Sequence, residues 1–295
     1  MNPTRLRPGA DGRLTIAVPA KGRMADPTLQ LCASAGLAFE VTERSLVVPC
    51  ANAPVDLLLV RPSDIPEYVQ DGVVHVGITG ANLVLEAAVT VKQVAELGFA
   101  RCTLDAAVPD DSEVVSIDQL AGQRVATAYP VSTRALLGER GVNCELVGIS
   151  GSVEVAPRLG LADAIVDLVS TGTTLSANGL RRIGTLLSSQ AVLISSDAAL
   201  DEQREAIARL ELMLSGVVAA RSRRYVMMNA HERDLDAIRA ILPGMGAPSV
   251  LPLADPGEIA VHAAVDVTDI WSVLPALKDA GASSILVVPV ERLVP

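Results

Sequence analysis

The chain has 295 residues, of which half are apolar and only 2% aromatic, and its formal net charge is −10. This length exceeds what one hydrophobic core usually organises, so two or three domains are expected. The negative charge argues against a nucleic-acid-binding surface, and no apolar run reaches the roughly 18 residues of a membrane span. The polar residues 1–12 do not resemble a signal peptide, and we expect a loose tail on a cytoplasmic protein.

The cysteines and histidines of the chain are scattered. The cysteines are Cys32, Cys50, Cys102 and Cys144, and no Cys-x-x-Cys spacing occurs among them. The histidines are His75, His231 and His262. This pattern favours reduced, inert thiols and predicts no metal site built from protein side chains alone.

Strand-like and helix-like segments alternate in the first hundred residues. Buried strands are expected at 14–18, 55–60 and 73–79. Helices are expected at 27–35, at 63–72 and after residue 82. Ser63 or Asp64 is expected to cap the second of these helices. This alternation, together with the lack of aromatic residues, predicts an α/β layer structure with a largely parallel sheet.

A second unit of the same kind begins near Phe99. Its strands are expected at 124–128, 144–147 and 164–169, and its helices at 133–140 and 153–159. The strand expected at 191–195 returns the chain to the first unit and leads into a helix at 197–214. The resulting division is a first α/β domain at 1–105 and 190–214, with a second α/β domain at 106–189 inserted into it.

The last part of the chain, residues 215–295, has a different order of strands and helices. Its strands are expected at 216–229, 249–253, 258–267 and 284–290. Its helices are expected at 232–242 and 269–280. The order β-α-β-β-α-β is that of a ferredoxin-like module. By analogy alone, such a module often binds a regulatory ligand or mediates assembly.

The segment Ala162–Leu175, ADAIVDLVSTGTTL, is the strongest candidate for a binding site. Asp163 and Asp167 share one face of the expected strand, and Asp167 lies near its carboxyl end, where open α/β sheets bind ligands. Small and hydroxylated residues then lead into a helix N-terminus, which favours a phosphate group. The alternative is that these serines and threonines only cap the helix. A flavin or a sugar phosphate would fit the loop equally well.

Asp167 narrows the choice of ligand for this loop. An anionic side chain repels phosphate but accepts hydrogen bonds from ribose hydroxyls. An acid followed by a small, hydroxylated glycine loop therefore favours a ribose 5-phosphate.

Several other positions at strand ends are weaker candidates. Lys21 and Arg23 flank Gly22, although the same segment could be an ordinary solvated turn. Arg61 directly follows a strand and precedes a helix start, where a basic residue is unfavourable for the helix dipole. Gly80 lies in the permissive turn GITGAN, and Glu154 could equally be an acid in a first helical turn.

The order of these motifs resembles that of the ATP phosphoribosyltransferase family, in its long form with a C-terminal regulatory domain. The segments that carry the resemblance are LTIAVPAKGRM, LLLVRPSDIPEYV, VGITGANL, RVATAYP, SGSVEVAPRLGLADAIVDLVSTGTTLSANGL and PGMGAPSVLPLADP. The resemblance covers nearly everything from residue 14 onward, and the block at 151–180 is the most specific. It implies two α/β domains like those of periplasmic binding proteins, with the active site in the cleft between them. It also implies transfer of phosphoribosyl from phosphoribosyl pyrophosphate to N1 of ATP, as the first step of histidine biosynthesis.

The same resemblance implies roles for individual residues. The expected phosphoribosyl pyrophosphate site comprises Asp163, Asp167, Leu168, Val169, Ser170, Thr171, Gly172, Thr173 and Thr174. The expected ATP site comprises Lys21, Gly22, Arg23, Arg61, Gly80 and Tyr129. The expected catalytic residues are Lys21, Arg61, Glu154 and Asp167. Magnesium would arrive on the pyrophosphate.

The implied partners are histidine, as feedback inhibitor, and further copies of the chain, from a dimer to a hexamer. The weak candidates for the inhibitor site are Asn229, Leu242, Ser249 and Ala282. Asn229 stands where the family often has an acid. His75 also replaces an expected acid, and Ala81-Asn82 replaces a basic-acidic pair.

Three rival interpretations remain at the sequence level. One is a two-lobed protein that binds a small anion without catalysis, and a second is a non-catalytic histidine sensor. Both are disfavoured by the intact loop that begins at Asp167. The third is another nucleotide or phosphosugar enzyme, which is disfavoured by the density of matched segments.

Overall fold

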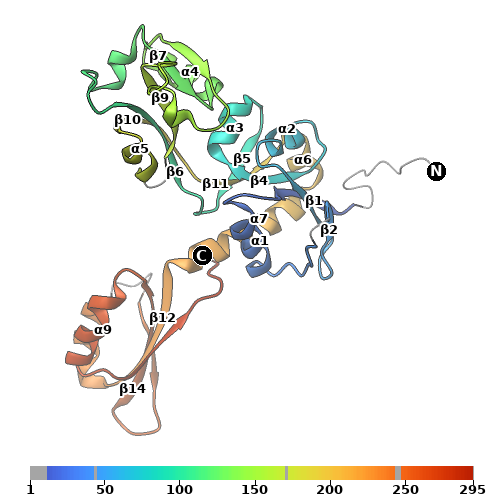
Figure 1. The fold of residues 1–295 in the computed structure, drawn as a ribbon. Coiled ribbons are helices and arrows are strands. Elements are labelled where there is room, and N and C mark those ends of the chain that lie inside the picture. Colours follow the sequence, from blue (N-terminus) through green and yellow to red (C-terminus); the bar gives the residue numbers. More distant parts are fainter. Residues whose placement is uncertain (1–11, 43–44, 170–171, 243–246, 295) are drawn as a thin grey trace. The chain divides into compact units, whose positions relative to one another are not determined.

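The computed structural model describes residues 12–42, 45–169, 172–242 and 247–294. The chain forms two compact units, Met1–Glu211 and Leu212–Pro295 (Figure 1). The expected loose tail lies, apart from Gly12, outside the described residues. No helix among the described residues is long and apolar enough to cross a membrane.

The first unit contains a six-stranded sheet, here sheet A. Its strands are β1 (Leu14–Pro19), β2 (Val47–Pro49), β3 (Val55–Val60), β4 (Val76–Gly80), β5 (Lys92–Glu96) and β11 (Ala191–Ser195), in the order β2-β3-β1-β4-β11-β5. The fully buried β1 pairs in parallel with β3 and β4. The three other strands pair antiparallel, so the sheet is mixed. The carboxyl ends of β1, β3 and β4 therefore lie at one edge.

The helices that follow these strands are α1 (Ala25–Ser34), α2 (Ile65–Gln70) and α3 (Ala81–Ala87). Ile65 and Val69 of α2 pack with Ala17 of β1 and Ile194 of β11 in one buried cluster. The expected cap of α2 is not formed by either candidate. Asp64 is the residue before the helix, but its carboxylate accepts a hydrogen bond from Ser63 Oγ at 2.9 Å instead of capping the helix.

A second sheet of the first unit, here sheet B, contains β6 (Cys102–Pro109), β7 (Arg124–Thr127), β8 (Glu145–Gly148), β9 (Ala164–Val169) and β10 (Leu180–Ser189). The strand order is β10-β6-β9-β7-β8, and β7 is parallel to β8 and β9. The helical segments are η1 (Ile117–Leu120), α4 (Pro130–Glu139), η2 (Val153–Val155) and α5 (Thr173–Ala177). The helix expected at 153–159 is thus only a short 3₁₀ turn, because Pro157 cannot supply a backbone N–H within a helix.

Sheets A and B are joined by two chain crossings. The chain leaves sheet A after β5, and it returns through Gln190, which is the one residue between β10 and β11. Strands β6 and β10 were not expected from the sequence, and they pair antiparallel with each other along most of their length. The domain boundary expected after residue 105 falls inside β6.

The segment around residue 216 is helical and not extended. After α6 (Asp197–Glu202), helix α7 runs from Arg204 to Arg221, and strand β12 spans only Arg223–His231. The strand expected at 216–229 is therefore wrong in its first half. The physical reason is the spacing of the buried side chains Leu210, Leu214 and Val217, which follows the helical period and not the strand period of two.

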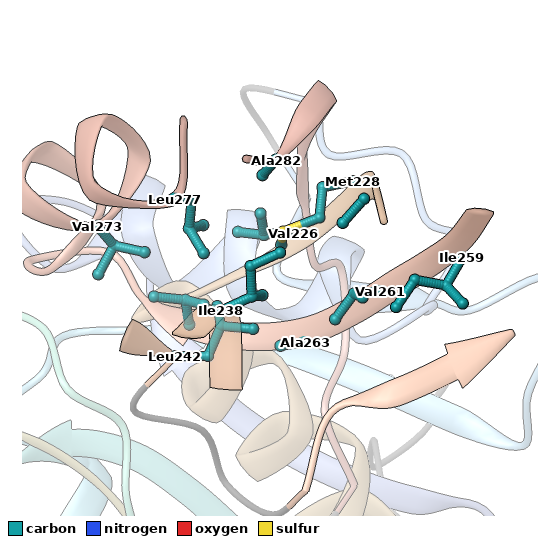
Figure 2. Packing of buried hydrophobic residues seen from close by; sticks show 12 residues of the cluster. Val226, Met228, Ile238, Leu242, Ile259, Val261, Ala263, Val273, Leu277 and Ala282 are labelled. Carbon is teal, nitrogen blue, oxygen red and sulfur yellow. The ribbon is translucent and has the colours of Figure 1, made fainter. Parts of the chain in front are cut away.

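The second unit is a four-stranded antiparallel sheet, here sheet C, covered on one face by two helices. Its elements are β12, η3 (Glu232–Asp234), α8 (Leu235–Ile241), β13 (Ser249–Pro252), β14 (Glu258–Asp266), α9 (Ile270–Asp279) and β15 (Ser283–Pro289). The strand order β13-β14-β12-β15 confirms the ferredoxin-like module. Figure 2 shows its core, where Ile238 and Leu277 of the helices pack on Val226 and Val261 of the strands.

Candidate active site

Sheet A brings three candidate residues to one edge. Lys21 follows β1, Arg61 follows β3, and Gly80 ends β4, and these strands run parallel to one another through β1. Lys21 and Arg61 are exposed. The strand β1 is also the point at which the chain changes direction along the sheet, since β3 lies on one side of it and β4 on the other. Ligands of open α/β sheets bind at such a point.

Sheet B also brings three candidate residues to one edge, but their side chains are a phenol and two carboxylates. Tyr129 follows β7, Glu154 follows β8, and Asp167 lies near the carboxyl end of β9. These three strands are parallel, and β7 lies between the other two. A tyrosine and two acids therefore gather at the ligand-binding edge of sheet B.

Tyr129 interacts electrostatically with charged residues at the ligand-binding edges of both sheet A and sheet B. Burial raises the pKa of Tyr129 above its usual value, the Asp167 carboxylate raises it further, and the Arg23 guanidinium lowers it. Arg23 belongs to the segment after β1, whereas Asp167 belongs to β9. The phenol of Tyr129 thus lies within electrostatic range of a cation from one sheet and an anion from the other.

Asp167 is partly buried, and its surroundings are well defined. The backbone N–H of Leu168 donates to Asp167 Oδ1 at 2.8 Å. Burial raises the pKa of Asp167, this N–H lowers it, and the Glu154 carboxylate raises it again. Acids with a raised pKa near a second acid are typical of functional sites.

The loop after β9 is described in its second half only. Ser170 and Thr171 lie outside the described residues. Gly172 has φ +78°, a left-handed conformation that favours glycine, and it directly precedes α5. Thr173 and Thr174 are exposed, while the buried Leu175 anchors the short helix in the core of sheet B. Leu168 and Val169 are partly buried and pack against opposite faces of this sheet.

Asp163 is not brought together with Asp167. It precedes β9 at the opposite edge of the sheet, where its carboxylate accepts hydrogen bonds from the backbone N–H of Arg124 at 2.9 Å and from Arg124 Nη2 at 3.0 Å. These hydrogen bonds hold the pKa of Asp163 below its usual value. Asp163 lies just before β9, so the strand runs between the two carboxylates and keeps them apart.

Asp105 was missed by sequence reasoning. It is 1% exposed, lies in β6 directly opposite Asp167, and accepts hydrogen bonds from Thr185 Oγ1 at 2.7 Å and Thr103 Oγ1 at 2.9 Å. Arg182 Nη1 lies 3.5 Å from its Oδ2. An acid inside the apolar run CTLDAAVP was the available signal, because a buried carboxylate needs such partners.

Two cavities adjoin the loop after β9. One, of about 660 Å³, lies at the chain crossings and includes Arg101 and Gln190 in its lining. The other, of about 860 Å³, includes Gly172, Thr173 and Arg182. Both are lined by Thr103 and Val169, and neither is lined by Asp167 or Tyr129. The position of the active site is therefore better indicated by Tyr129 and its charged neighbours Arg23 and Asp167 than by the size of a cavity.

Comparison with known proteins identifies the family. The family model described as "ATP phosphoribosyltransferase" matches residues 61–216, and the model described as "HisG, C-terminal domain" matches residues 220–292. An ATP phosphoribosyltransferase of Bacteroides thetaiotaomicron is 40% identical over 95% of this chain and 99% of its own length. The chain belongs to the ATP phosphoribosyltransferase family. It is therefore a glycosyltransferase of the phosphoribosyltransferase class, and it acts in histidine biosynthesis.

Other relatives agree with this assignment. An ATP phosphoribosyltransferase of Maricaulis maris is 43% identical over 95% of this chain and 98% of its own length. Among solved structures, a chain of the "ATP phosphoribosyl transferase (HisG:HisZ) complex from Thermotoga maritima" matches with a TM-score of 0.61 and 26% identity. That match covers 70% of this chain and 98% of the solved chain.

Two departures from the expected ATP phosphoribosyltransferase pattern have local explanations. His75 Nδ1 accepts a hydrogen bond from the backbone N–H of Thr15 at 2.9 Å, and burial lowers the pKa of this histidine. The buried Asn82 pairs with Ser189, whose Oγ donates to Asn82 Oδ1 at 2.9 Å. Gly80 makes room for this asparagine, since a Cβ at Gly80 would lie 2.5 Å from Asn82 Oδ1.

Metal ligands and reactive thiols are not evident in the described part of the chain. No group of three or more histidine, cysteine, aspartate or glutamate side chains there could hold a metal ion. Burial, with the nearby Cys50, raises the pKa of Cys32 to about 12, and burial also raises the pKa of Cys50 and Cys144. Protonated thiols of this kind are poor nucleophiles.

The four candidates for the inhibitor site do not gather in one place. Leu242 and Ala282 are buried in the core of sheet C beneath its helices. Asn229 and Ser249 belong to β12 and β13, where they alternate with core residues and so lie on the opposite face. Sequence position alone could not separate these two faces.

Proposed function

We propose that this chain transfers the phosphoribosyl group of phosphoribosyl pyrophosphate to N1 of the adenine of ATP and releases pyrophosphate. The observation that carries the proposal is the position of Asp167. It is a partly buried acid beside the loop after β9, with its pKa raised, and it lies within electrostatic range of Tyr129 and Glu154.

The donor is assigned to sheet B. Asp167 accepts hydrogen bonds from the ribose hydroxyls, and the loop from Ser170 to Thr174 holds the 5′-phosphate. The left-handed Gly172 and the exposed position of Thr174 in the first turn of α5 support this assignment. Leu168 and Val169 contribute backbone only, since their side chains pack on the sheet. Asp163 keeps a structural role with Arg124.

The acceptor and the leaving group are assigned to the edge of sheet A. In the reaction, the bond between C1′ and the pyrophosphate oxygen breaks, and a bond between C1′ and N1 of adenine forms. The transition state carries positive charge at C1′ and growing negative charge on the pyrophosphate. Lys21 and Arg61 stabilise the leaving group, while Gly22, Arg23, Gly80 and Tyr129 contact ATP. Glu154 stabilises the positive charge beside Asp167, and no covalent nucleophile is needed.

In this proposal, magnesium enters the site bound to the phosphates of the substrate. The described residues do not build a cage for a metal ion, and magnesium usually binds through substrate phosphates with few protein ligands. The ion neutralises pyrophosphate charge when it is bound there. Each step above relies on the chain's own cations and hydrogen-bond donors.

We also propose that histidine inhibits the enzyme through the second unit and that the chain forms a cytoplasmic homo-oligomer, from a dimer to a hexamer. The match of residues 220–292 to the HisG C-terminal domain supports a regulatory role for this unit. The exposed side chains of Leu251 and Leu286 on sheet C support association. Within the first unit, we keep the division into two domains but move its first boundary to residues 97–101, because β6 belongs to sheet B.

Two matched aspartates test the donor site. Asp167→Asn should lower kcat/KM on the order of 10²-fold, because hydrogen bonds to a charged group contribute about 1.5–3 kcal/mol each. Asp163→Asn should leave kcat/KM within about threefold, since its exposed ion pair contributes little. Calorimetric titration with phosphoribosyl pyrophosphate should show weakened binding for Asp167→Asn only. Near-normal turnover of that variant would refute the ribose assignment.

A further inference from the structure

The first turn of α4 is capped by a residue from another part of the chain. The carboxylate of Glu86 accepts hydrogen bonds from the backbone N–H of Val131 at 3.1 Å and of Ser132 at 2.8 Å, and from Ser132 Oγ at 2.7 Å. Glu86 belongs to α3 of the sheet A region, whereas α4 belongs to the sheet B region. Figure 1 shows α3 between the strands of sheet A and α4, in agreement with its contacts to both.

Helix α4 lacks a local cap of its own. Tyr129 occupies the N-cap position and makes no side-chain cap hydrogen bond, and Pro130 in the first turn has no N–H. Ser, Thr, Asp or Asn normally fills such a position. Glu86 therefore supplies, from 45 residues earlier in the chain, the acceptor that the local sequence omits. A carboxylate at a helix N-terminus is also favoured by the helix dipole.

Helix α3 is anchored at its start and ends soon after Glu86. At its start, the backbone N–H of Asn82 donates to Ser189 Oγ at 3.0 Å, which ties it to the last residue of β10. At its end, Ala88 adopts φ +52°, a conformation that costs an ordinary residue energy and stops the helix two residues after Glu86. The position of Glu86 is thus fixed by a short, anchored helix.

Tyr129 lies between the end of β7 and the residues of α4 that Glu86 binds. Its backbone N–H donates to Thr127 Oγ1 at 2.9 Å, and the two residues that Glu86 binds follow it almost directly. Tyr129 is partly buried and lies near both Arg23 and Asp167, as described above. A shift of α4 relative to α3 would move this tyrosine away from one of them.

We propose that Glu86 is a positioning residue, which fixes α4 against α3 and thereby holds Tyr129 between the acceptor edge of sheet A and the donor edge of sheet B. This inference rests on the proposed reaction. Transfer requires the donor, held by one sheet, and ATP, held by the other, to meet in a near-attack geometry. Glu86 provides three hydrogen bonds between these two regions in addition to the two chain crossings.

A double-mutant cycle tests the kinetic part of this inference. Glu86→Ala should lower kcat by roughly 10- to 100-fold, since misplacement by about 1 Å can cost 10²-fold, while the affinity for phosphoribosyl pyrophosphate stays within about threefold. Glu86→Gln, which keeps an acceptor oxygen, should recover part of this loss. The combination of Glu86→Ala with Ser132→Ala should be less harmful than the product of the two single effects. Glu139→Ala, at the exposed end of α4, is the matched control and should change nothing.

Spin-label distances test the contact independently of turnover. Labels at Asp71 and Arg140, both exposed, report on sheet A and sheet B when Cys144 is replaced by Ser. The distance distribution should be narrow in the parent protein and in Glu139→Ala, and broader or shifted in Glu86→Ala. Unchanged kcat in Glu86→Ala, or an unchanged distance distribution, would overturn the inference. Absence of turnover in the parent protein would instead refute the proposed reaction, and the distance measurement would still decide the role of the contact.

Discussion

At the scale of single residues, the acids of sheet B differ because of their surroundings. Asp167 is partly buried and close to Glu154, Asp163 is exposed and paired with Arg124, and Asp105 is enclosed by hydroxyls and an arginine. The sequence could predict that Asp167 ends a strand beside a glycine loop. It could not predict that Asp105 lies opposite Asp167, because this pairing depends on the unexpected strand β6.

The raised pKa of Asp167 predicts a pH dependence. Burial and the Glu154 carboxylate keep Asp167 protonated above the ordinary pKa of 3.8, and a protonated acid is a poor acceptor for ribose hydroxyls. The acidic limb of the kcat/KM profile for phosphoribosyl pyrophosphate should therefore lie above pH 3.8. By linkage, burial of this acid also costs stability as the pH rises through its raised pKa.

Glu154→Gln separates the two causes of the raised pKa of Asp167, which are burial and the Glu154 carboxylate. Removing the neighbouring negative charge should move the acidic limb to lower pH, whatever the variant does to the maximal rate. The kcat/KM profile between pH 4 and pH 8 would be measured for both proteins. A limb that stays in place, or moves to higher pH, would show that Glu154 does not act on Asp167 electrostatically.

At the scale of secondary-structure elements, apolar runs located the strands at 55–60, 164–169 and 191–195 with their bounds. The search for apolar runs did not predict two kinds of element. The strands β6 and β10 carry polar residues such as Thr103, Asp105 and Thr185, which obscure a continuous apolar run. The end of α7 is rich in alanine and valine, which fit both a helix and a buried strand.

Leu212 and Leu214, which lie at the end of the helix expected at 197–214, test the helical assignment of α7. In α7, Leu214 is fully buried and Leu212 is 49% exposed, whereas a strand would place both on the same face. Leu214→Ala should lower the free energy of unfolding by about 2–5 kcal/mol, and Leu212→Ala by less than about 1 kcal/mol. Urea unfolding of both variants gives the comparison. Equal losses would contradict the helical assignment.

At the scale of the whole molecule, the order of motifs predicted an α/β enzyme with a ferredoxin-like C-terminal module, and both are confirmed. The order of elements was sufficient for this, because β-α-β-β-α-β patterns leave few topologies. The inhibitor site was less predictable. Its four candidates lie on two faces of sheet C, and a one-dimensional pattern does not distinguish a core face from an open one without the strand register.

The histidine proposal makes a prediction for the intact chain. Addition of histidine to the full-length enzyme should lower turnover in a saturable manner, because a ligand that binds one state preferentially shifts the population toward it. Alanine at the same concentrations is the control. Turnover that is insensitive to histidine over a wide range would remove the feedback role from the second unit.

The central claim is that this chain joins phosphoribosyl to ATP, with Asp167 holding the donor. The most direct measurement mixes the full-length protein with ATP, phosphoribosyl pyrophosphate and Mg²⁺, and follows pyrophosphate release together with the mass of the nucleotide product. The account predicts pyrophosphate release that requires ATP, a nucleotide product heavier than ATP by one phosphoribosyl group, and formation of both that is slower on the order of 10²-fold in Asp167→Asn. Folded protein that releases no pyrophosphate, or releases it without ATP, would contradict the account.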